Sequence, residues 1–125
     1  MIISTGIDIV EVYRIAETMT RTPRFTERVF TDAERAYCDA KGAAAAQSYA
    51  GRFAAKEAFL KALQTGWRGK ITWHDIEILS DDRGVPILNI KGEASELFRK
   101  SGATRSHITI SHTSEHAVAQ IIFEK

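Results

Sequence analysis

The longest helical signal in this 125-residue chain is GAAAAQSYAGRFAAKEAFLKALQT, residues 42–65. The segment is rich in alanine and free of proline, as the interior of a helix requires. Gly51 is its one weak internal position, and Gly66 is the expected C-terminal cap. The residues expected to pack against the rest of the protein are Tyr49, Phe53, Leu60 and Leu63.

Shorter elements are predicted on both sides of this helix. Residues 2–10 alternate as a strand, with Asp8 on the more polar face and Ile7 and Ile9 on the other. The remaining predictions are a helix over 11–21 ended by Pro23, a helix from the capping box at 31–34 to Cys38, a hairpin of 76–79 and 85–90, a helix over 93–100 closed by Gly102, and strands over 107–111 and 117–123. Strands at both ends with helices between them indicate an α+β fold.

Composition favours one domain over residues 1–125 and disfavours several classes of protein. The chain is 44% hydrophobic and 26% charged, which leaves little room for a second domain. Its single cysteine, Cys38, rules out an internal disulfide and favours the reducing cytoplasm. We expect neither export nor a membrane span, because no signal peptide or run of about 18 apolar residues is visible. A net charge of +1 offers no global attraction for nucleic acid.

A short basic stripe is the main local charge feature. On a helix over 11–21, Arg14 and Arg21 lie on a different face from the apolar Val12 and Ile15. Such a stripe is by default a solvated face, and the alternative is a docking surface for an acidic partner. The members of the stripe are Arg14, Arg21, Arg24 and Arg28.

Three charged residues could carry phosphoryl-transfer chemistry. Glu57 and Lys61 lie one helical turn apart, and for an arbitrary pair an exposed ion pair worth about 0.2–0.5 kcal/mol is the better interpretation. The alternative is that Glu57 binds a hard cation or accepts a proton while Lys61 neutralises phosphate oxygens. Asp8 alone is most simply an exposed strand end. Magnesium uses one or two carboxylates together with substrate phosphates, so Asp8 and Glu57 would suffice if folding brings them together.

The cluster Ser111-His112-Thr113 at the end of a strand has two equally favoured interpretations. It is either a partly solvated structural histidine or a phosphate-binding group of hydroxyl, imidazole and backbone N–H. No hydrolase triad, zinc-ligand spacing, Walker A sequence or dinucleotide glycine fingerprint is present. Trp67 and Trp73 could stack on a base, but packing against the core is the simpler interpretation.

Taken in order along the chain, several motifs together resemble the bacterial holo-[acyl-carrier-protein] synthases. They are Gly6-Ile7-Asp8 followed by Arg14, Gly51-Arg52-Phe53-Ala-Ala-Lys56-Glu57-Ala58 with Lys61, Asp82-Arg83-Gly84-Val85-Pro86, and Ser111-His112-Thr113. Each is weak alone, and their ordered combination is specific. The resemblance implies an α+β domain of the 4'-phosphopantetheinyl transferase type, with a small β-sheet packed around one long helix.

The activity that the resemblance implies is a transferase of fatty acid biosynthesis. A serine of an apo acyl carrier protein would attack the phosphorus of coenzyme A that carries pantetheine, and adenosine 3',5'-bisphosphate would leave. The implied cofactor is Mg²⁺, and the implied assembly is a homotrimer with active sites at its interfaces. Two alternatives stay open: a noncatalytic module that binds the carrier, and another metal-dependent phosphotransfer enzyme acting on a small nucleotide.

The resemblance also implies roles for individual residues. Asp8 and Glu57 would hold magnesium on the pyrophosphate of coenzyme A, and Lys61 would lie beside that pyrophosphate. Glu57, directly or through a water molecule on the metal, is the candidate acceptor of the serine proton. The residues implied in binding coenzyme A phosphates are Arg52, Lys61, His112 and Thr113. The residues implied in docking the acidic carrier are Arg14, Arg21, Arg24 and Arg28.

One departure from the family pattern follows the long helix. Gln64-Thr65-Gly66 stands where the family frequently has Gly-Thr-Gly. We therefore expect a helix that runs slightly longer. Trp67 and Arg68 make the next loop bulkier, which leaves the pantetheine channel and the preferred carrier open.

Overall fold

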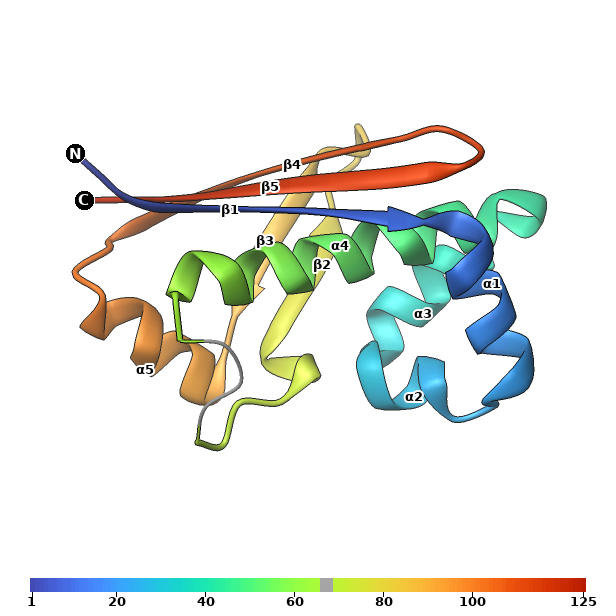
Figure 1. Cartoon of the computed structure of the whole chain (residues 1–125), viewed down its shortest axis with the longest axis horizontal. Helices are drawn as coiled ribbons and strands as arrows, with labels where there is room; N and C mark the ends of the chain where they lie inside the picture. The colour runs from blue at the N-terminus through green and yellow to red at the C-terminus, as the bar shows by residue number, and fades with distance from the viewer. Residues whose placement is uncertain (66–68) are drawn as a thin grey trace.

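The computed structural model describes residues 1–65 and 69–125 (Figure 1). The elements in chain order are β1 (Ile2–Glu11), α1 (Val12–Arg21), α2 (Phe25–Val29), α3 (Asp32–Asp39), η1 (Gly42–Ala44), α4 (Ala45–Leu63), η2 (Trp73–Asp75), β2 (Ile76–Ser80), β3 (Pro86–Ile90), α5 (Gly92–Lys100), β4 (Arg105–His112) and β5 (His116–Glu124). The predicted α+β class is confirmed. The short helix α2 and the two 3₁₀ turns were not predicted.

Two antiparallel sheets pack against the long helix α4. One has the strand order β1-β5-β4, and the other is the hairpin of β2 and β3. Strands β1 and β5 pair from Ile2 opposite Glu124 to Glu11 opposite His116, so the two chain termini lie side by side. In Figure 1, α4 runs beneath the three-stranded sheet, with α1, α2 and α3 at one end and α5 at the other. None of the helices that the structure describes is long and apolar enough to cross a membrane.

Small residues allow α4 to lie directly against the sheet. An ideal Cβ on Gly6 would lie 1.9 Å from the carbonyl oxygen of Ala58, and one on Gly51 would lie 2.9 Å from Ile110 Cγ2. The Ser4 hydroxyl donates to the carbonyl oxygen of Ala62 at 2.6 Å. The face of β1 that carries Ser4 and Gly6 therefore packs on the helix, and this close approach places the end of β1 beside α4.

The core confirms the packing residues predicted for α4. Tyr49, Leu60 and Leu63 are buried, and Phe53 is partly buried between Phe25 and Trp73. Trp73 packs against the core as expected. One hydrophobic cluster lies between α4, the two sheets and α5. A second lies between α4 and the helices α1, α2 and α3. Both clusters contain residues of α4, which makes this helix the centre of the fold.

The C-terminus of α4 corrects two expectations. The helix ends at Leu63 rather than running longer, and its cap is Gln64 instead of Gly66. Gln64 adopts the left-handed conformation, with φ of 63°, which glycine tolerates better than a residue with a side chain. Gly66 lies outside the described residues, as do Trp67 and Arg68, on which the expectation for the pantetheine channel rested.

Replacing Gln64 by glycine is expected to stabilise the protein by about 1 kcal/mol, because glycine adopts positive φ without a steric cost at Cβ. Urea unfolding of the wild type and the variant measures the difference. Q64A is the matched control, since alanine keeps the Cβ and should give no such gain. Equal stability of Q64G and Q64A would contradict the explanation.

A buried ion pair fixes α4 against the neighbouring elements. Lys56 has no exposed side-chain surface, and its Nζ donates to Glu34 Oε1 at 2.9 Å and to the carbonyl oxygens of Trp73 and Ile76. Glu34 also accepts from the backbone N–H groups of Thr31 and Ile78. The capping box predicted at the start of α3 is confirmed. Glu34 therefore both caps α3 and pairs with Lys56. Burial lowers the pKa of Lys56, and the charge of Glu34 opposes that effect.

Candidate active site

The packing of β1 on α4 brings three of the predicted residues together. Lys61, in the last turn of α4, donates from Nζ to Asp8 Oδ1 and to the carbonyl oxygen of Ile7, each at 3.0 Å. Asp8 and Glu57 line the same cavity, which has a volume of about 610 Å³. Asp8 comes from β1, two residues after the close approach at Gly6, and Glu57 comes from the middle of α4. The predicted magnesium site requires folding to bring Asp8 and Glu57 together. The structure does so, because both residues line one cavity.

The pKa of Glu57 depends on its burial and on the charges of Asp8 and Lys61. Burial raises the pKa of its carboxyl above the ordinary value, the negative charge of Asp8 raises it further, and Lys61 partly opposes both. A cation near Glu57 and Asp8 would reduce the cost of ionising the Glu57 carboxyl. The pair can therefore attract a positive charge or accept a proton.

The oxygen donors of this site suit a hard cation that is bound partly by the protein and partly by a substrate. Among residues 1–65 and 69–125, no group of three histidine, cysteine, aspartate or glutamate side chains is arranged to hold a metal ion. Among the described residues, the carboxylates that line the cavity are those of Asp8, Glu11 and Glu57. Glu11 pairs with Arg14, so the predicted pair of Asp8 and Glu57 is the better candidate to hold a cation. Mg²⁺ is commonly bound through one or two carboxylates, with water and substrate phosphates completing its octahedron.

The cavity that Asp8 and Glu57 line also has apolar walls and one arginine of the basic stripe, Arg14. Phe25 and Phe53, whose ring centroids are 6.0 Å apart, contribute to its wall, and Arg14 lies at its edge. Arg14 is exposed and pairs with Glu11 at 2.9 Å. The other three arginines of the stripe are also exposed, on α1, the turn after it and α2: Arg21, Arg24 and Arg28.

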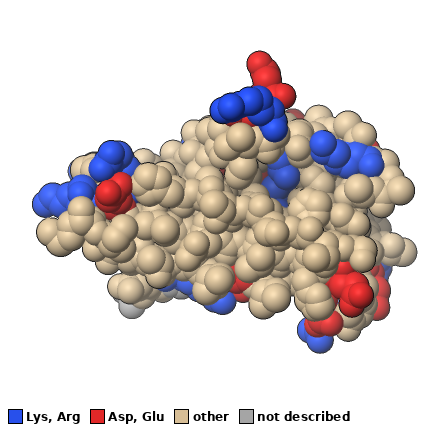
Figure 2. Space-filling view, turned by 90° about the horizontal axis from the view of Figure 1, so that it is seen from above, with Lys and Arg blue, Asp and Glu red and all other residues tan. Residues whose placement is uncertain are grey.

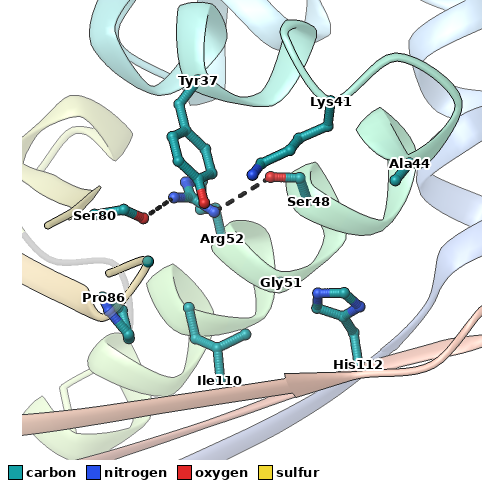
Figure 3. Close-up of a pocket in the computed structure, with 11 residues that line it drawn as sticks. Tyr37, Lys41, Ala44, Ser48, Gly51, Arg52, Ser80, Pro86, Ile110 and His112 are labelled. Atoms are coloured by element: carbon teal, nitrogen blue, oxygen red, sulfur yellow. Dashed lines mark hydrogen bonds between the residues drawn. The ribbon is translucent and has the colours of Figure 1, made fainter. Parts of the chain in front are cut away.

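A second cavity, of about 230 Å³, surrounds Arg52 (Figure 3). Arg52 is 6% exposed, and its guanidinium donates to Ser80 Oγ at 2.8 Å and to Ser48 Oγ at 3.3 Å. The same group lies 4.1 Å from the ring centre of Tyr37. Among the residues that the structure describes, Arg52 Nε finds no hydrogen-bond partner. His112, at the end of β4, points into the same cavity.

Sequence reasoning found Arg52 and His112 but missed most of their surroundings. Ser48 lies one helical turn before Arg52, so its spacing was a usable signal. The other polar residues of this cavity come from different elements: Tyr37, Lys41 and Ser80. Together they form a concave basic site suited to a phosphate group.

The predicted phosphate-binding residues do not meet in one place. Arg52 and His112 line one cavity, Lys61 lies at Asp8, and Thr113 lies in the turn after β4. Its hydroxyl accepts from the backbone N–H groups of Glu115 and His116 in the turn between β4 and β5. It is absent from the described residues that line either of the two cavities. In this structure Thr113 shapes the turn that follows His112.

Comparisons with known proteins agree with one another on the family of this chain. The family model of the 4'-phosphopantetheinyl transferase superfamily matches residues 4–121. The holo-[acyl-carrier-protein] synthase of Koribacter versatilis is 47% identical over 99% of both chains. The crystal structure of a holo-(acyl-carrier-protein) synthase from Bacillus anthracis in complex with CoA (3',5'-ADP) has 41% identity and a TM-score of 0.81, covering 99% of this chain and 97% of that one.

The overall fold is also shared with a synthase from another bacterium. The crystal structure of the holo-[acyl-carrier-protein] synthase of Neisseria meningitidis has a TM-score of 0.89 and 32% identity, and the match covers all of both chains. Family model, sequence and fold therefore lead to the same group of enzymes. The chain belongs to the 4'-phosphopantetheinyl transferase superfamily and, within it, to the holo-[acyl-carrier-protein] synthases.

Proposed function

We propose that this protein transfers the 4'-phosphopantetheine group of coenzyme A to a serine of an apo acyl carrier protein and releases adenosine 3',5'-bisphosphate, as a step of fatty acid biosynthesis. The observation that carries the proposal is the meeting of Asp8, Glu57 and Lys61 beside an arginine-bordered cavity. Relatives that match over the whole chain are named for this activity, and one of them is described in complex with CoA (3',5'-ADP).

Magnesium is the proposed cofactor, and Asp8 and Glu57 are the residues that would hold it. A bound Mg²⁺ ion would neutralise the pyrophosphate of coenzyme A and help align it for displacement. The support from this chain is that Asp8 and Glu57 line one cavity and that the charge of Asp8 raises the pKa of Glu57. Lys61 would add a second positive charge beside the pyrophosphate, where negative charge grows as the leaving group departs.

The transfer needs a proton acceptor but no covalent enzyme intermediate. The serine oxygen would form a bond to phosphorus while the bond from phosphorus to the leaving phosphate oxygen breaks. Glu57 is the proposed acceptor of the serine proton, either directly or through water. The place of Glu57 in the wall of the cavity that Asp8 also lines supports this role.

The cavity around Arg52 is the proposed binding site for a phosphate group of coenzyme A. A buried guanidinium, the His112 imidazole and nearby hydroxyl groups support this assignment. Lys41 adds a further positive charge. Thr113, which lies in the next turn, would contribute through the position that it gives to His112.

Replacing Arg52 by glutamine is expected to raise the KM for coenzyme A by about tenfold or more, because a charge-assisted contact to phosphate is lost. Steady-state rates at saturating carrier would measure the change, and thermal melts would establish that the variant is folded. An equal rise in the KM for the carrier would contradict a specific role in coenzyme binding.

Arg14 and its neighbours are the proposed docking surface for the acidic carrier. R14E is expected to raise the KM for the carrier far more than the KM for coenzyme A, because the change reverses a charge that faces the carrier alone. R99E is the matched control, since Arg99 is exposed on α5 at the opposite end of the molecule. Equal effects of R14E on both KM values would argue against docking.

A homotrimer in the cytoplasm is the proposed form of the protein. Figure 2 looks onto the outer face of the three-stranded sheet and shows a broad area without charged side chains. Ile7 and Ile9 of β1 are 57% and 66% exposed and alternate with Gly6 and Asp8 along the strand, as is typical of a surface that another chain covers. Light scattering of the purified protein would measure the mass. The proposed cytoplasmic location rests on Cys38, which is a buried free thiol.

Release of adenosine 3',5'-bisphosphate distinguishes the proposed transfer from its two alternatives. The protein is incubated with coenzyme A and Mg²⁺, with and without an apo carrier, and the nucleotide products are separated by chromatography. The proposal predicts adenosine 3',5'-bisphosphate only when the apo carrier is present. Its release without carrier would favour an enzyme acting on small nucleotides. Carrier binding with no release would favour a noncatalytic module.

A further inference from the structure

Lys61 contacts the very carboxylate to which a metal ion would bind. Its Nζ lies 3.0 Å from Asp8 Oδ1 and 3.0 Å from the carbonyl oxygen of Ile7. The side chain of Asp8 is 17% exposed and that of Lys61 is 55% exposed. The lysine therefore reaches a largely buried carboxylate from the solvent side.

The ammonium group takes up contacts that suit a divalent cation. A carboxylate oxygen and a backbone carbonyl are both hard oxygen donors. Lys61 also acts on Glu57, since its charge lowers the pKa of that carboxyl while Asp8 raises it. Lys61 thus partly balances the negative charge of the two carboxylates that would hold a divalent cation.

We propose that Lys61 hinders divalent cations from binding to Asp8 in the free protein, and that coenzyme A admits the cation by drawing the ammonium onto its pyrophosphate. The inference rests on the proposed function for the identity of the coenzyme. A divalent cation on Asp8 and an ammonium 3.0 Å from the same carboxylate repel each other at short range. A pyrophosphate relieves this repulsion, because it offers Lys61 another anionic partner.

The consequence is positive coupling between the cation and the coenzyme. Each binds more tightly when the other is present, and the factor is the same in both directions. The free protein would hold little metal, and the carboxylates would receive it together with the substrate. Lys61 is the residue that links the two events, because it contacts Asp8 in one state and the pyrophosphate in the other.

Manganese binding without the carrier tests this inference. Mn²⁺ accepts the same oxygen donors as Mg²⁺ and is quantified by electron paramagnetic resonance of the free ion. The dissociation constant is measured with and without coenzyme A for the wild type, K61M, K61R and K100M. Lys100 is exposed in the last turn of α5, so K100M removes the same charge at a distance from the site.

The expected result is a gain in affinity that is specific to K61M. Without coenzyme A, K61M should bind Mn²⁺ at least about fivefold more tightly than the wild type, which corresponds to the loss of one partly exposed ion pair. K61R, which keeps the positive charge, and K100M should each stay within about twofold of the wild type. Coenzyme A should tighten Mn²⁺ binding to the wild type more than to K61M.

Two results would overturn the inference. One is Mn²⁺ affinity of K61M equal to or weaker than that of the wild type in the absence of coenzyme A. The other is an equal gain in K100M, which would show that only net charge matters. Carrier modification by the wild type, measured in parallel, separates the two proposals: transfer without a gain in K61M rejects this inference alone. Absence of both transfer and Mn²⁺ binding rejects the metal site and the inference together.

Discussion

Replacing Glu57 by glutamine is expected to lower the rate of carrier modification by about 10²-fold or more while the protein stays folded. Glutamine keeps the shape of the side chain but loses the anionic oxygen that would bind a cation and accept the serine proton. Initial rates at saturating coenzyme A and Mg²⁺ measure the loss. E96Q is the matched control, because Glu96 pairs with Arg99 on the exposed face of α5. A wild-type rate for E57Q would exclude Glu57 as ligand and as base.

The same substitution is expected to raise thermal stability at neutral pH. The raised pKa of Glu57 means that folding disfavours its ionised form, so the charge destabilises the native state above that pKa. Below the pKa of the unfolded chain the carboxyl is neutral in both states, and this cost disappears. The melting temperature of E57Q should therefore exceed that of the wild type at pH 7, and the difference should vanish near pH 4. A difference that does not change with pH would contradict the argument.

Replacing Lys56 by methionine is expected to cost about 3–5 kcal/mol of stability, because Glu34 would be left as a buried charge without its partner. Lys56 and Glu34 are both completely buried, and the lysine Nζ also serves the carbonyl oxygens of Trp73 and Ile76. Urea unfolding followed by circular dichroism measures the loss. If K56M does not fold in buffer alone, adding a stabilising osmolyte to both proteins allows the same comparison.

A double substitution shows how much of this loss is electrostatic. In K56M/E34Q the buried pair is neutral, and the glutamine oxygen can still accept one of the backbone N–H groups that Glu34 serves. The double variant should be less destabilised than the sum of K56M and E34Q. Additive losses, or a cost below about 1 kcal/mol for K56M, would show that the pair does not stabilise the fold as described.

The fold was predictable where its signals are local. The alanine-rich helix, the alternating first strand and the capping box at Thr31 are confirmed, because each depends on neighbours a few residues away. Helix α2 was missed because five residues give too little periodicity to detect. The end of α4 was wrong because Gln64 adopts a conformation for which glycine is the usual signal.

The candidate site was predictable in part, and the limit was again distance along the chain. Residue chemistry made Asp8, Glu57 and Lys61 candidates and a resemblance implied their roles, but their meeting depends on the packing of β1 against α4. The pairing of Lys56 with Glu34 joins residues 22 positions apart, and no local pattern indicates it. The surroundings of Arg52 come from α3, α4 and the hairpin, so only folding assembles them.

The intact mass of an apo acyl carrier protein after incubation with this protein and coenzyme A tests the central claim most directly. Parallel reactions contain Mg²⁺ or a chelator, and a carrier whose acceptor serine is replaced by alanine serves as the control. We predict a gain of one phosphopantetheine per carrier with Mg²⁺, and no gain with the chelator or on the alanine carrier. An unchanged mass across several apo carriers, with the protein shown to be folded, would contradict the account.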